Sequence, residues 1–242
     1  MEGSRFQTRA ATLSRIDAVA KDTFVYHLSL DAPLPFAAGQ FVNLAVPEAK
    51  PRGERSYSIY SSPLEPGVLQ LCIKLVEGGA ASEYLRLSKE GDLMQVRGPF
   101  GVFTLAEGPD PVIFVATATG IAPFRSMLLE RAASPVRDTR KYCMYFGVRA
   151  QEDLFALDDL AGLARDLPDF AYTVCLSRPV PEWPGPTPVF FNGRVTTALA
   201  ADYPVPTEHF YLCGNGAMIE ETRALLKDRG LDRKRIHVEK YY

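Results

Sequence analysis

The pattern of apolar and polar residues changes near residue 107, and this change divides the chain into two parts. In the first part, short segments alternate apolar with polar residues and are separated by glycine, proline, serine and aspartate. Such alternation predicts strands with one buried face, and several short strands at close spacing are typical of an antiparallel barrel or sandwich. Strands are expected within residues 8–20, 23–33, 39–48, 55–62, 67–79 and 92–101, and a short helix within 81–91.

In the second part, after the polar segment 106–111, apolar strands alternate strictly with helices. Strands that are apolar on both faces and alternate with helices predict a parallel sheet covered by helices. We expect strands within 111–116, 141–148, 170–177, 209–214 and 235–242, and helices within 122–133, 153–167, 193–203 and 216–230. The predicted fold is a two-domain protein, with an N-terminal antiparallel β-barrel at 1–107 and a C-terminal α/β, Rossmann-like domain with a five-stranded parallel sheet at 108–242.

The composition excludes several classes of protein. The 242 residues are 47% hydrophobic, enough for a sizeable core, and the formal net charge of −2 offers no general attraction for nucleic acid or an anionic membrane. No apolar run approaches the roughly 20 residues of a membrane span, and the first residues lack the apolar stretch of a signal peptide, so a cytoplasmic protein is expected. The four cysteines form no C-x-x-C pair, which gives no support for a metal or iron–sulfur site.

The turns from strand to helix are the places where ligands bind in a parallel sheet of this kind. In the first turn, Ala116–Pro123, small residues let a diphosphate approach the backbone, and the start of the following helix offers unpaired N–H groups. The turn does not match G-x-G-x-x-G. Two interpretations stay open, an anion site or a tight turn whose small residues serve packing alone.

Arginines follow the next strands of the predicted sheet. Arg149 ends one strand, Ser177 and Arg178 end another, and Arg194 opens the helix after that. Because guanidinium groups match phosphate oxygens in geometry, this set predicts a site for a ribose 2′-phosphate and favours NADP(H) over NAD(H). The alternative is that each arginine is a solvated surface residue or closes a salt bridge at a helix end.

The last of these turns begins with Cys213 and continues into a glycine-rich stretch. Cys213 either borders a nicotinamide ring as a small polarizable wall or is a buried cysteine without a chemical role. Nothing near it in the sequence lowers its pKa, so a nucleophilic role has no support.

In the first part of the chain, alternation places Arg55 and Tyr57 on one face of a strand. A guanidinium for a diphosphate, an aromatic plane for a ring system and a hydroxyl for a ring nitrogen are the groups that a flavin needs. The alternative is an edge strand with a solvated arginine and a packed tyrosine. Residues 78–82 lead into a helix and form either a second phosphate site or a simple strand-to-helix turn.

Taken in order, six motifs resemble those of the ferredoxin–NADP reductase family, nearest to its compact bacterial ferredoxin/flavodoxin–NADP(H) reductases. The motifs are R-S-Y-S from Arg55, G-G-A-A-S from Gly78, T-A-T-G-I-A-P-F-R from Thr117, S-R from Ser177, C-G-N-G-A-M from Cys213, and V-E-K-Y-Y from Val238. The resemblance spans nearly the whole chain. It implies a barrel that binds FAD, an α/β domain that binds NADP(H), and a cleft at which flavin and nicotinamide meet.

The resemblance also implies roles for single residues. Arg55 and Ser82 bind the FAD diphosphate, Tyr57 flanks the isoalloxazine ring, and Ser58 hydrogen-bonds near flavin N5. Thr117, Thr119 and Gly120 line the path of the NADP pyrophosphate and nicotinamide, and Ser177 and Arg178 take the 2′-phosphate together with Arg149 and Arg194. Lys74, Gly79 and Ala81 complete the implied cofactor-binding set, and Ser58, Cys213, Glu239 and Tyr241 shape the hydride-transfer site.

The last two tyrosines match the aromatic residue that stacks on the flavin in this family, where the nicotinamide must arrive. Tyr241 stands two residues after the acid Glu239, and Tyr242 matches an additional aromatic that lies by the FAD adenine in some bacterial members. We favour Tyr241 for the flavin ring. One departure from the family is that Ala116 and Ala118 stand where its members are richer in glycine.

The function that the resemblance implies is hydride transfer between NADP(H) and flavin N5, coupled to one-electron exchange with a separate, transiently bound ferredoxin or flavodoxin. A monomer is expected. The alternative within enzymes is an NAD(P)H-dependent flavin reductase or the reductase component of an oxygenase. A non-catalytic nucleotide-binding or redox-sensing subunit is the alternative from another class.

Overall fold

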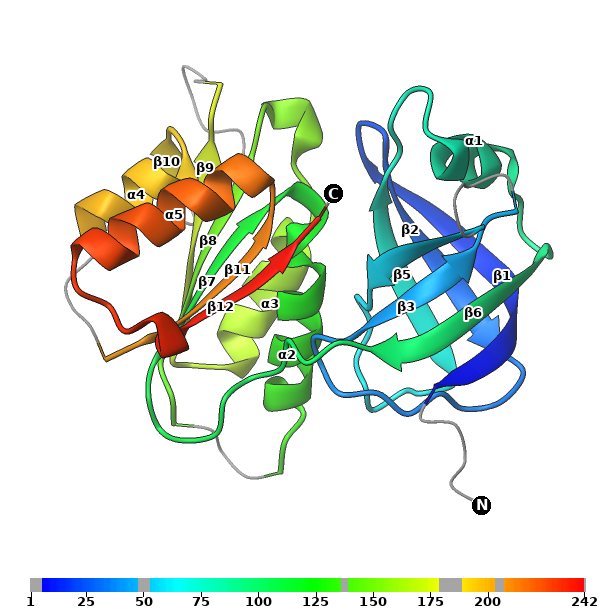
Figure 1. The fold of residues 1–242 in the computed structure, drawn as a ribbon, viewed down its shortest axis with the longest axis horizontal. Helices are drawn as coiled ribbons and strands as arrows, with labels where there is room; N and C mark the ends of the chain where they lie inside the picture. Colours follow the sequence, from blue (N-terminus) through cyan, green and yellow to red (C-terminus); the bar gives the residue numbers. More distant parts are fainter. Residues whose placement is uncertain (1–5, 48–52, 136–138, 179–188, 203–206, 242) are drawn as a thin grey trace. The chain divides into compact units, whose positions relative to one another are not determined.

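The computed structural model describes residues 6–47, 53–135, 139–178, 189–202 and 207–241. The chain divides into two compact units. The first unit contains residues 1–105 together with 122–130, and the second contains residues 106–121 together with 131–242. Each unit contains its own six-stranded sheet (Figure 1).

The sheet of the first unit is antiparallel throughout. A bridge between Ile59 and Leu71 joins its two outer strands, so the sheet closes into a barrel (Figure 1). The predicted antiparallel barrel is therefore confirmed. Its strands are β1 (Gln7–Ala20), β2 (Thr23–Leu30), β3 (Phe41–Ala45), β4 (Glu54–Ser58), β5 (Val68–Lys74) and β6 (Leu93–Phe100), in the order β4-β3-β6-β1-β2-β5.

The barrel core collects the inward side chains of alternating strand positions. Val42 and Leu44 of β3 and Leu69 of β5 are buried in it, and helix α1 (Ala80–Leu87) packs Leu85 against the same core. Burying one such side chain contributes about 1.5–3 kcal/mol. Because a slip of one residue would turn these side chains outward, the core fixes the register of β3 and of its neighbour β4.

The first part of helix α2 (Ala122–Ala132) belongs to the first unit, although it follows the barrel in the chain. Phe124 and Ser126 of this helix are fully buried. The ring of Phe124 lies 5.9 Å from that of Phe103, centroid to centroid, and the Ser126 hydroxyl donates to the carbonyl of Ser61 at 2.7 Å. These contacts hold the beginning of α2 against the residues that follow β4 and β6.

The sheet of the second unit is parallel, as predicted for the Rossmann-like domain. The described residues form six strands in this sheet rather than the five expected. The additional strand has only four residues, of sequence VFFN, and such a short apolar stretch gives no measurable alternation. The strands are β7 (Val112–Thr117), β8 (Tyr142–Val148), β9 (Phe170–Leu176), β10 (Val189–Asn192), β11 (His209–Gly214) and β12 (Ile236–Lys240).

The strand order β10-β9-β8-β7-β11-β12 shows that the chain runs outward from β7 to β10 and then returns past β7 to β11. Because parallel connections are right-handed, this reversal puts α4 (Val195–Asp202) and α5 (Gly216–Asp228) on the face opposite α3 (Leu157–Asp166) (Figure 1). The reversal lies between β7 and β11. Ligands of open α/β sheets bind beyond the carboxyl ends of the strands at such a point.

Within the described ranges, no helix is long and apolar enough to cross a membrane. The described side chains also include no group of three or more His, Cys, Asp or Glu that is arranged to hold a metal ion.

Candidate functional site

Two turns meet at the point where the strand order of the parallel sheet reverses. The turn after β7 contains the 3₁₀ helix Ala118–Ile121, and the turn after β11 begins at Gly214. The hydroxyl of Thr117 accepts a hydrogen bond from the backbone N–H of Asn215 at 2.8 Å, which ties the two turns together. Both turns therefore form one small-residue surface at the carboxyl ends of β7 and β11.

Glycine is required at this surface because the two backbones lie so close together. A Cβ atom on Gly120 would overlap the carbonyl of Cys213, and a Cβ atom on Gly214 would overlap the side chain of Thr117. Gly214 also has a φ of +126°, which disfavours any other residue. Gly120 and Thr117, both predicted to line the dinucleotide path, are therefore brought together here, with Thr119 in the same 3₁₀ helix.

Ala118 adopts a left-handed backbone conformation in this turn, with a φ of +48°. Alanine carries a Cβ atom and is strained there by about 1–2 kcal/mol relative to the right-handed conformation. Ala116, the other alanine of the predicted motif, lies in β7 and is fully buried. Of the two alanines that stand where the family is richer in glycine, Ala118 is therefore the one with a strained backbone.

The amino-terminal end of α5 borders the same surface. The side chain of Asn215 accepts hydrogen bonds from the N–H groups of Ala217 at 2.9 Å and Met218 at 3.4 Å, so Asn215 is the N-cap. The Lys240 side chain lies against Gly216, since a Cβ atom built on Gly216 would be 3.3 Å from the Lys240 ammonium nitrogen. A helix N-terminus beside a lysine forms a positive region that suits an anion.

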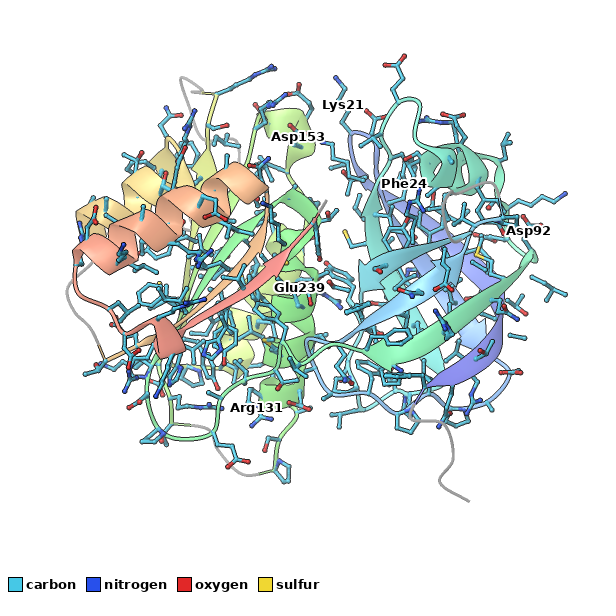
Figure 2. The ribbon with its side chains drawn as sticks, viewed as in Figure 1. Lys21, Phe24, Asp92, Arg131, Asp153 and Glu239 are labelled. Carbon is cyan, nitrogen blue, oxygen red and sulfur yellow. The ribbon has the colours of Figure 1, made fainter. Side chains whose placement is uncertain are left out.

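Cys213, Glu239 and Tyr241 lie together at the ends of β11 and β12. The pairing of these strands sets Cys213 opposite Glu239, which lies near the end of β12 (Figure 2). Burial raises the pKa of the Cys213 thiol well above its usual range, and the negative charge of Glu239 raises it further, while hydrogen bonds with the Tyr241 side chain and the Gly214 backbone oppose the shift. A raised pKa favours the neutral thiol over the thiolate that a nucleophile needs.

The predicted phosphate-binding residues at the ends of β8 and β9 also lie side by side. The backbone N–H of Arg178 donates to the carbonyl of Arg149 at 2.8 Å, and that of Ser177 donates to the carbonyl of Val148 at 3.1 Å. The side chains of Arg149, Ser177 and Arg178 are exposed. Two guanidinium groups and one hydroxyl are thus presented from adjacent strand ends.

Arg194 has a different environment from the other two arginines. Its guanidinium forms an ion pair of 3.1 Å with Glu221 of α5, and Thr196 donates to the same carboxylate at 3.3 Å. The structure therefore uses Arg194 to connect the start of α4 to α5. For Arg194, the structure therefore shows the alternative stated from the sequence, in which the arginine closes a salt bridge at a helix end.

In the barrel, Arg55 and Tyr57 project from the same side of β4, as their spacing predicts. Their partners across the ladder are Leu44 and Val42 of β3, so both side chains are on the inward side. Burial raises the pKa of Tyr57 to about 12, with a small opposing effect of Arg55, so its hydroxyl is protonated. Ser58 points to the other side of the strand and is buried.

Helix α1 starts at the glycine-rich turn that the sequence marks as a second phosphate site. Gly79 is its N-cap and provides no side chain for the first N–H groups. The Ser82 hydroxyl is buried and accepts a hydrogen bond from the N–H of Val76 at 2.8 Å. Ala81 lies in the first turn of α1, and Lys74 is an exposed residue at the end of β5.

Tyr242 lies outside the described residues. Asn215 and Lys240 belong to the motifs that begin at Cys213 and Val238, but neither was predicted as a site residue, although an asparagine directly before a helix is a recognised capping signal. Arg125, the last residue of the motif that begins at Thr117, was not predicted as a site residue either.

Comparison with known proteins defines the class of the molecule. Residues 10–105 match the family of oxidoreductase FAD-binding domains, and residues 114–224 match the family of oxidoreductase NAD-binding domains. A chain with one domain of each kind is a flavin- and nicotinamide-dependent oxidoreductase. This confirms the prediction of an enzyme with FAD and a nicotinamide dinucleotide as cofactors.

The relatives identify the family within that class. The chain is 38% identical over 211 residues to ferredoxin–NADP reductase B of Sorangium cellulosum, covering 85% of each protein. It is 33% identical to the phenol hydroxylase P5 protein of Acinetobacter pittii, covering 99% of this chain and 67% of that one. The structure matches Amycolatopsis cytochrome P450 reductase GcoB with a TM-score of 0.85 and 31% identity, covering 97% of this chain and 70% of that one. The chain belongs to the ferredoxin reductase family.

Proposed function

We propose that the protein is an NADP(H)-dependent FAD reductase that exchanges single electrons with a separate ferredoxin or flavodoxin. The observation that carries the choice of NADP(H) is the pair of exposed arginines at the ends of β8 and β9, with Ser177 between them in sequence order. Arginine binds phosphate through two parallel N–H bonds. A ribose 2′-phosphate, which NADP(H) carries and NAD(H) lacks, is the group that this pair suits.

The nicotinamide dinucleotide would lie along the surface formed by the two joined turns. Gly120 and Gly214 let the two turns pack backbone against backbone, so the surface that the turns form carries no bulky side chain at these positions. The diphosphate would meet unpaired backbone N–H groups at the start of the helix that follows. Thr117 fixes the two turns relative to each other through its hydrogen bond to Asn215. These residues bind and orient the coenzyme and need no charge of their own.

FAD would be held in the barrel unit. Arg55 of β4 and the open N-terminus of α1 supply a guanidinium and backbone N–H groups for its diphosphate, and Tyr57 supplies an aromatic plane for its ring. When bound, FAD supplies the hydride and one-electron chemistry, and the protein supplies orientation and electrostatics. Ser58 lies next to Tyr57 in the strand and is the candidate hydrogen-bond partner for the flavin ring.

The neutral thiol of Cys213, the carboxylate of Glu239 and the ring of Tyr241 would form the wall against which the nicotinamide is placed. Their positions are fixed by the pairing of β11 with β12 and by the hydrogen bond between Tyr241 and Cys213. A neutral thiol offers a small polarizable surface without attacking the ring. Tyr241 would act as a replaceable cover of the flavin ring.

A second candidate is the reductase component of an oxygenase. It is favoured by the 33% identity to the phenol hydroxylase P5 protein over 99% of this chain. That protein is longer than this chain, which covers 67% of it. The four cysteines of the present sequence are widely separated, so in either function the electrons would pass to an iron–sulfur or flavin carrier outside residues 1–242.

Stopped-flow spectroscopy of the FAD-loaded protein tests the proposal directly. NADPH should bleach the flavin absorbance much faster than NADH at equal concentrations, and the reduced protein should then pass electrons to ferredoxin or flavodoxin on mixing. Faster transfer to an oxygenase component than to either carrier would favour the second candidate. A protein that takes up no FAD would overturn both.

The arginine assignment has a matched control in the same domain. Arg178→Ala should raise the KM for NADPH by roughly tenfold to hundredfold and leave the KM for NADH nearly unchanged, because it removes hydrogen bonds to a charged group. Arg194→Ala also removes an arginine, but this one is paired with Glu221, so the preference for NADPH should persist. Equal effects of Arg178→Ala on the two coenzymes would contradict the assignment.

A further inference from the structure

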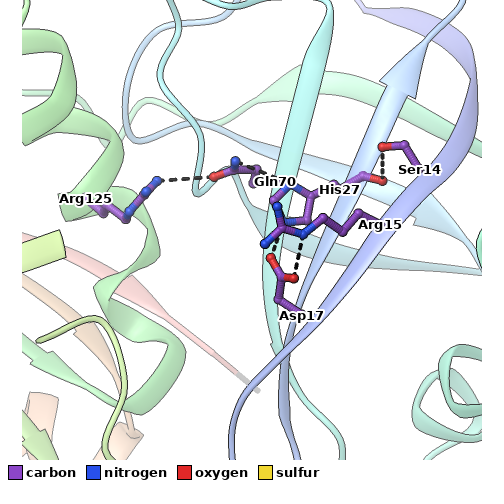
Figure 3. A network of polar contacts seen from close by, with 6 residues as sticks. All are labelled: Ser14, Arg15, Asp17, His27, Gln70 and Arg125. Atoms are coloured by element: carbon purple, nitrogen blue, oxygen red, sulfur yellow. Dashed lines mark hydrogen bonds and ion pairs between the residues drawn. The ribbon is translucent and has the colours of Figure 1, made fainter. Parts of the chain in front are cut away.

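A chain of hydrogen bonds runs across the neighbouring strands β1, β2 and β5, from an exposed ion pair to helix α2 (Figure 3). Asp17 lies 2.6 Å from the Nε of Arg15 and 2.8 Å from the Nε2 of His27. The Nδ1 of His27 lies 3.4 Å from the Nε2 of Gln70, and the Oε1 of Gln70 lies 3.3 Å from a guanidinium nitrogen of Arg125. Strand pairing sets His27 opposite Arg15 on one side and opposite Gln70 on the other.

Only one arrangement of donors and acceptors makes every contact in this chain a hydrogen bond. A guanidinium group donates and never accepts, so the oxygen of the Gln70 amide must face Arg125. The amide nitrogen then faces His27 and donates, which requires the Nδ1 of His27 to be an acceptor. This arrangement uses the His27 tautomer with its single proton on Nε2, from which the ring donates a hydrogen bond to Asp17.

Arg125 reaches the segment that follows the candidate flavin-binding strand. Its guanidinium donates to the carbonyl of Tyr60 at 2.9 Å and lies 4.1 Å from the centre of the Tyr60 ring. The neighbouring Ser126 donates to the carbonyl of Ser61 at 2.7 Å. Tyr60 and Ser61 come directly after β4 and its bridge residue Ile59.

The same helix begins directly after the 3₁₀ turn that carries Thr119 and Gly120. Helix α2 is thus continuous in the chain with the candidate dinucleotide turn, and it contacts the residues next to the candidate flavin strand. A change in how Arg125 holds Tyr60 would change the position of that strand end relative to α2.

We propose that Asp17, His27 and Gln70 form a proton-sensitive relay that positions Arg125 against Tyr60, and that protonation of His27 weakens this hold. The effect of the relay on hydride transfer rests on the proposed function. Gln70 and His27 are accordingly positioning residues.

Protonation of His27 places a second N–H against the amino group of Gln70. Either the bond between His27 and Gln70 is lost, or the amide turns and presents its amino group to Arg125, which then loses an acceptor. The charged groups that face His27 are Asp17 and Arg15 from β1 and, beyond Gln70, Arg125 from α2.

Nitrogen-15 NMR of the full-length protein tests the relay without measuring activity. At pH 8 the His27 ring should show the tautomer with its proton on Nε2. On acidification, the side-chain Nε resonance of Arg125 should shift in step with the protonation of His27. The Gln70→Leu variant should lose this coupled shift. A His27 tautomer protonated on Nδ1 would overturn the proposal. So would an Arg125 Nε resonance that does not shift when His27 is protonated.

Stopped-flow reduction of the FAD-loaded protein by NADPH, from pH 8 to 5.5, tests the functional consequence. The wild-type rate should fall by about threefold to tenfold as His27 is protonated. This is less than the roughly tenfold or more expected for the complete loss of a hydrogen bond to a charged group, because Arg125 keeps its bond to the Tyr60 carbonyl. Gln70→Glu should abolish this fall, because a carboxylate accepts from both protonated His27 and Arg125. Gln70→Leu should show the reduced rate of the acid form at every pH, so its rate should not change between pH 8 and 5.5.

Gln95→Glu is the matched control, because it makes the same change at an exposed position of β6. It should keep the wild-type pH profile. If Gln70→Glu and Gln70→Leu both keep that profile too, the relay does not position the site and the proposal is wrong. If NADPH fails to reduce the flavin in the wild-type protein, the proposed function is wrong, and the NMR experiment alone decides whether the relay exists.

Discussion

Replacing Ala118 with glycine should stabilise the protein and tighten coenzyme binding at the same time. Ala118 has a φ of +48°, a conformation that costs an ordinary residue about 1–2 kcal/mol and glycine almost nothing. Glycine also makes the unfolded chain more flexible, which costs about 0.4–1 kcal/mol. The difference predicts a net gain of about 0.5–1 kcal/mol and a melting temperature higher by about 1–4 °C.

Ala156 provides a control for the stability part of this prediction. It has nearly the same backbone conformation, with a φ of +60°, but it is the N-cap of α3 and not part of the turn after β7. Ala156→Gly should therefore raise the melting temperature by a similar amount. Only Ala118→Gly removes a methyl group from the candidate dinucleotide surface, so only this variant should lower the KM for NADPH, by roughly twofold to fivefold.

Thermal unfolding followed by circular dichroism and steady-state reduction of ferricyanide by NADPH measure the two effects. A drop in melting temperature for Ala118→Gly would refute the argument from backbone strain. An unchanged KM for NADPH in Ala118→Gly, or an equal change in Ala156→Gly, would show that the methyl group of Ala118 does not face the coenzyme.

Three further predictions concern stability and coenzyme choice. His209 and His237 lie 3.0 Å apart, and burial lowers the pKa of both below the ordinary 6.5, so the unfolded chain binds more protons in mild acid. Thermal stability should be full above pH 6.5 and fall as the pH drops below it, and His237→Asn should flatten this dependence. Gly214→Ala should destabilise the protein by about 2–4 kcal/mol in urea unfolding, whereas Gly230→Ala, with positive φ but no nearby atoms, should cost less. Tyr241→Ser should raise the rate with NADH relative to NADPH in steady-state assays, and an unchanged ratio would contradict its role as a cover.

Much of the fold could be predicted because the apolar pattern reports burial directly. Each barrel strand has one inward side, so alternation revealed all six, and the strands of the parallel sheet are buried on both sides. The pattern failed at two places where tertiary contacts decide. β10 has four residues and is too short to show a period. The helix expected from residue 153 begins only at Leu157, because Ala156 is left-handed and Phe155 packs edge-on against Phe146 instead.

The candidate site could be predicted where it depends on the ends of neighbouring strands. Arg149 and Arg178 lie side by side because parallel strands bring their carboxyl ends to one edge. Arg194 was also predicted from its place after a strand of this sheet. Its ion-pair partner Glu221 comes from α5, and a contact between residues so far apart in the chain cannot be predicted from the local sequence. The relay to Arg125 is of the same kind, since its members come from β1, β2, β5 and α2.

Residues 122–130 belong to the barrel unit, although they follow the barrel in the chain. This limits where the domains of two such proteins can be joined to make a chimera. A chimera joined near residue 107 would give the barrel a foreign α2, whose side chains would have to replace the buried Phe124, Ser126 and Met127. Mismatched side chains there would leave cavities or unpaired polar groups, which cost several kcal/mol. Shuffling of reductase modules, by evolution or in the laboratory, should therefore succeed most often when this helix travels with its own barrel.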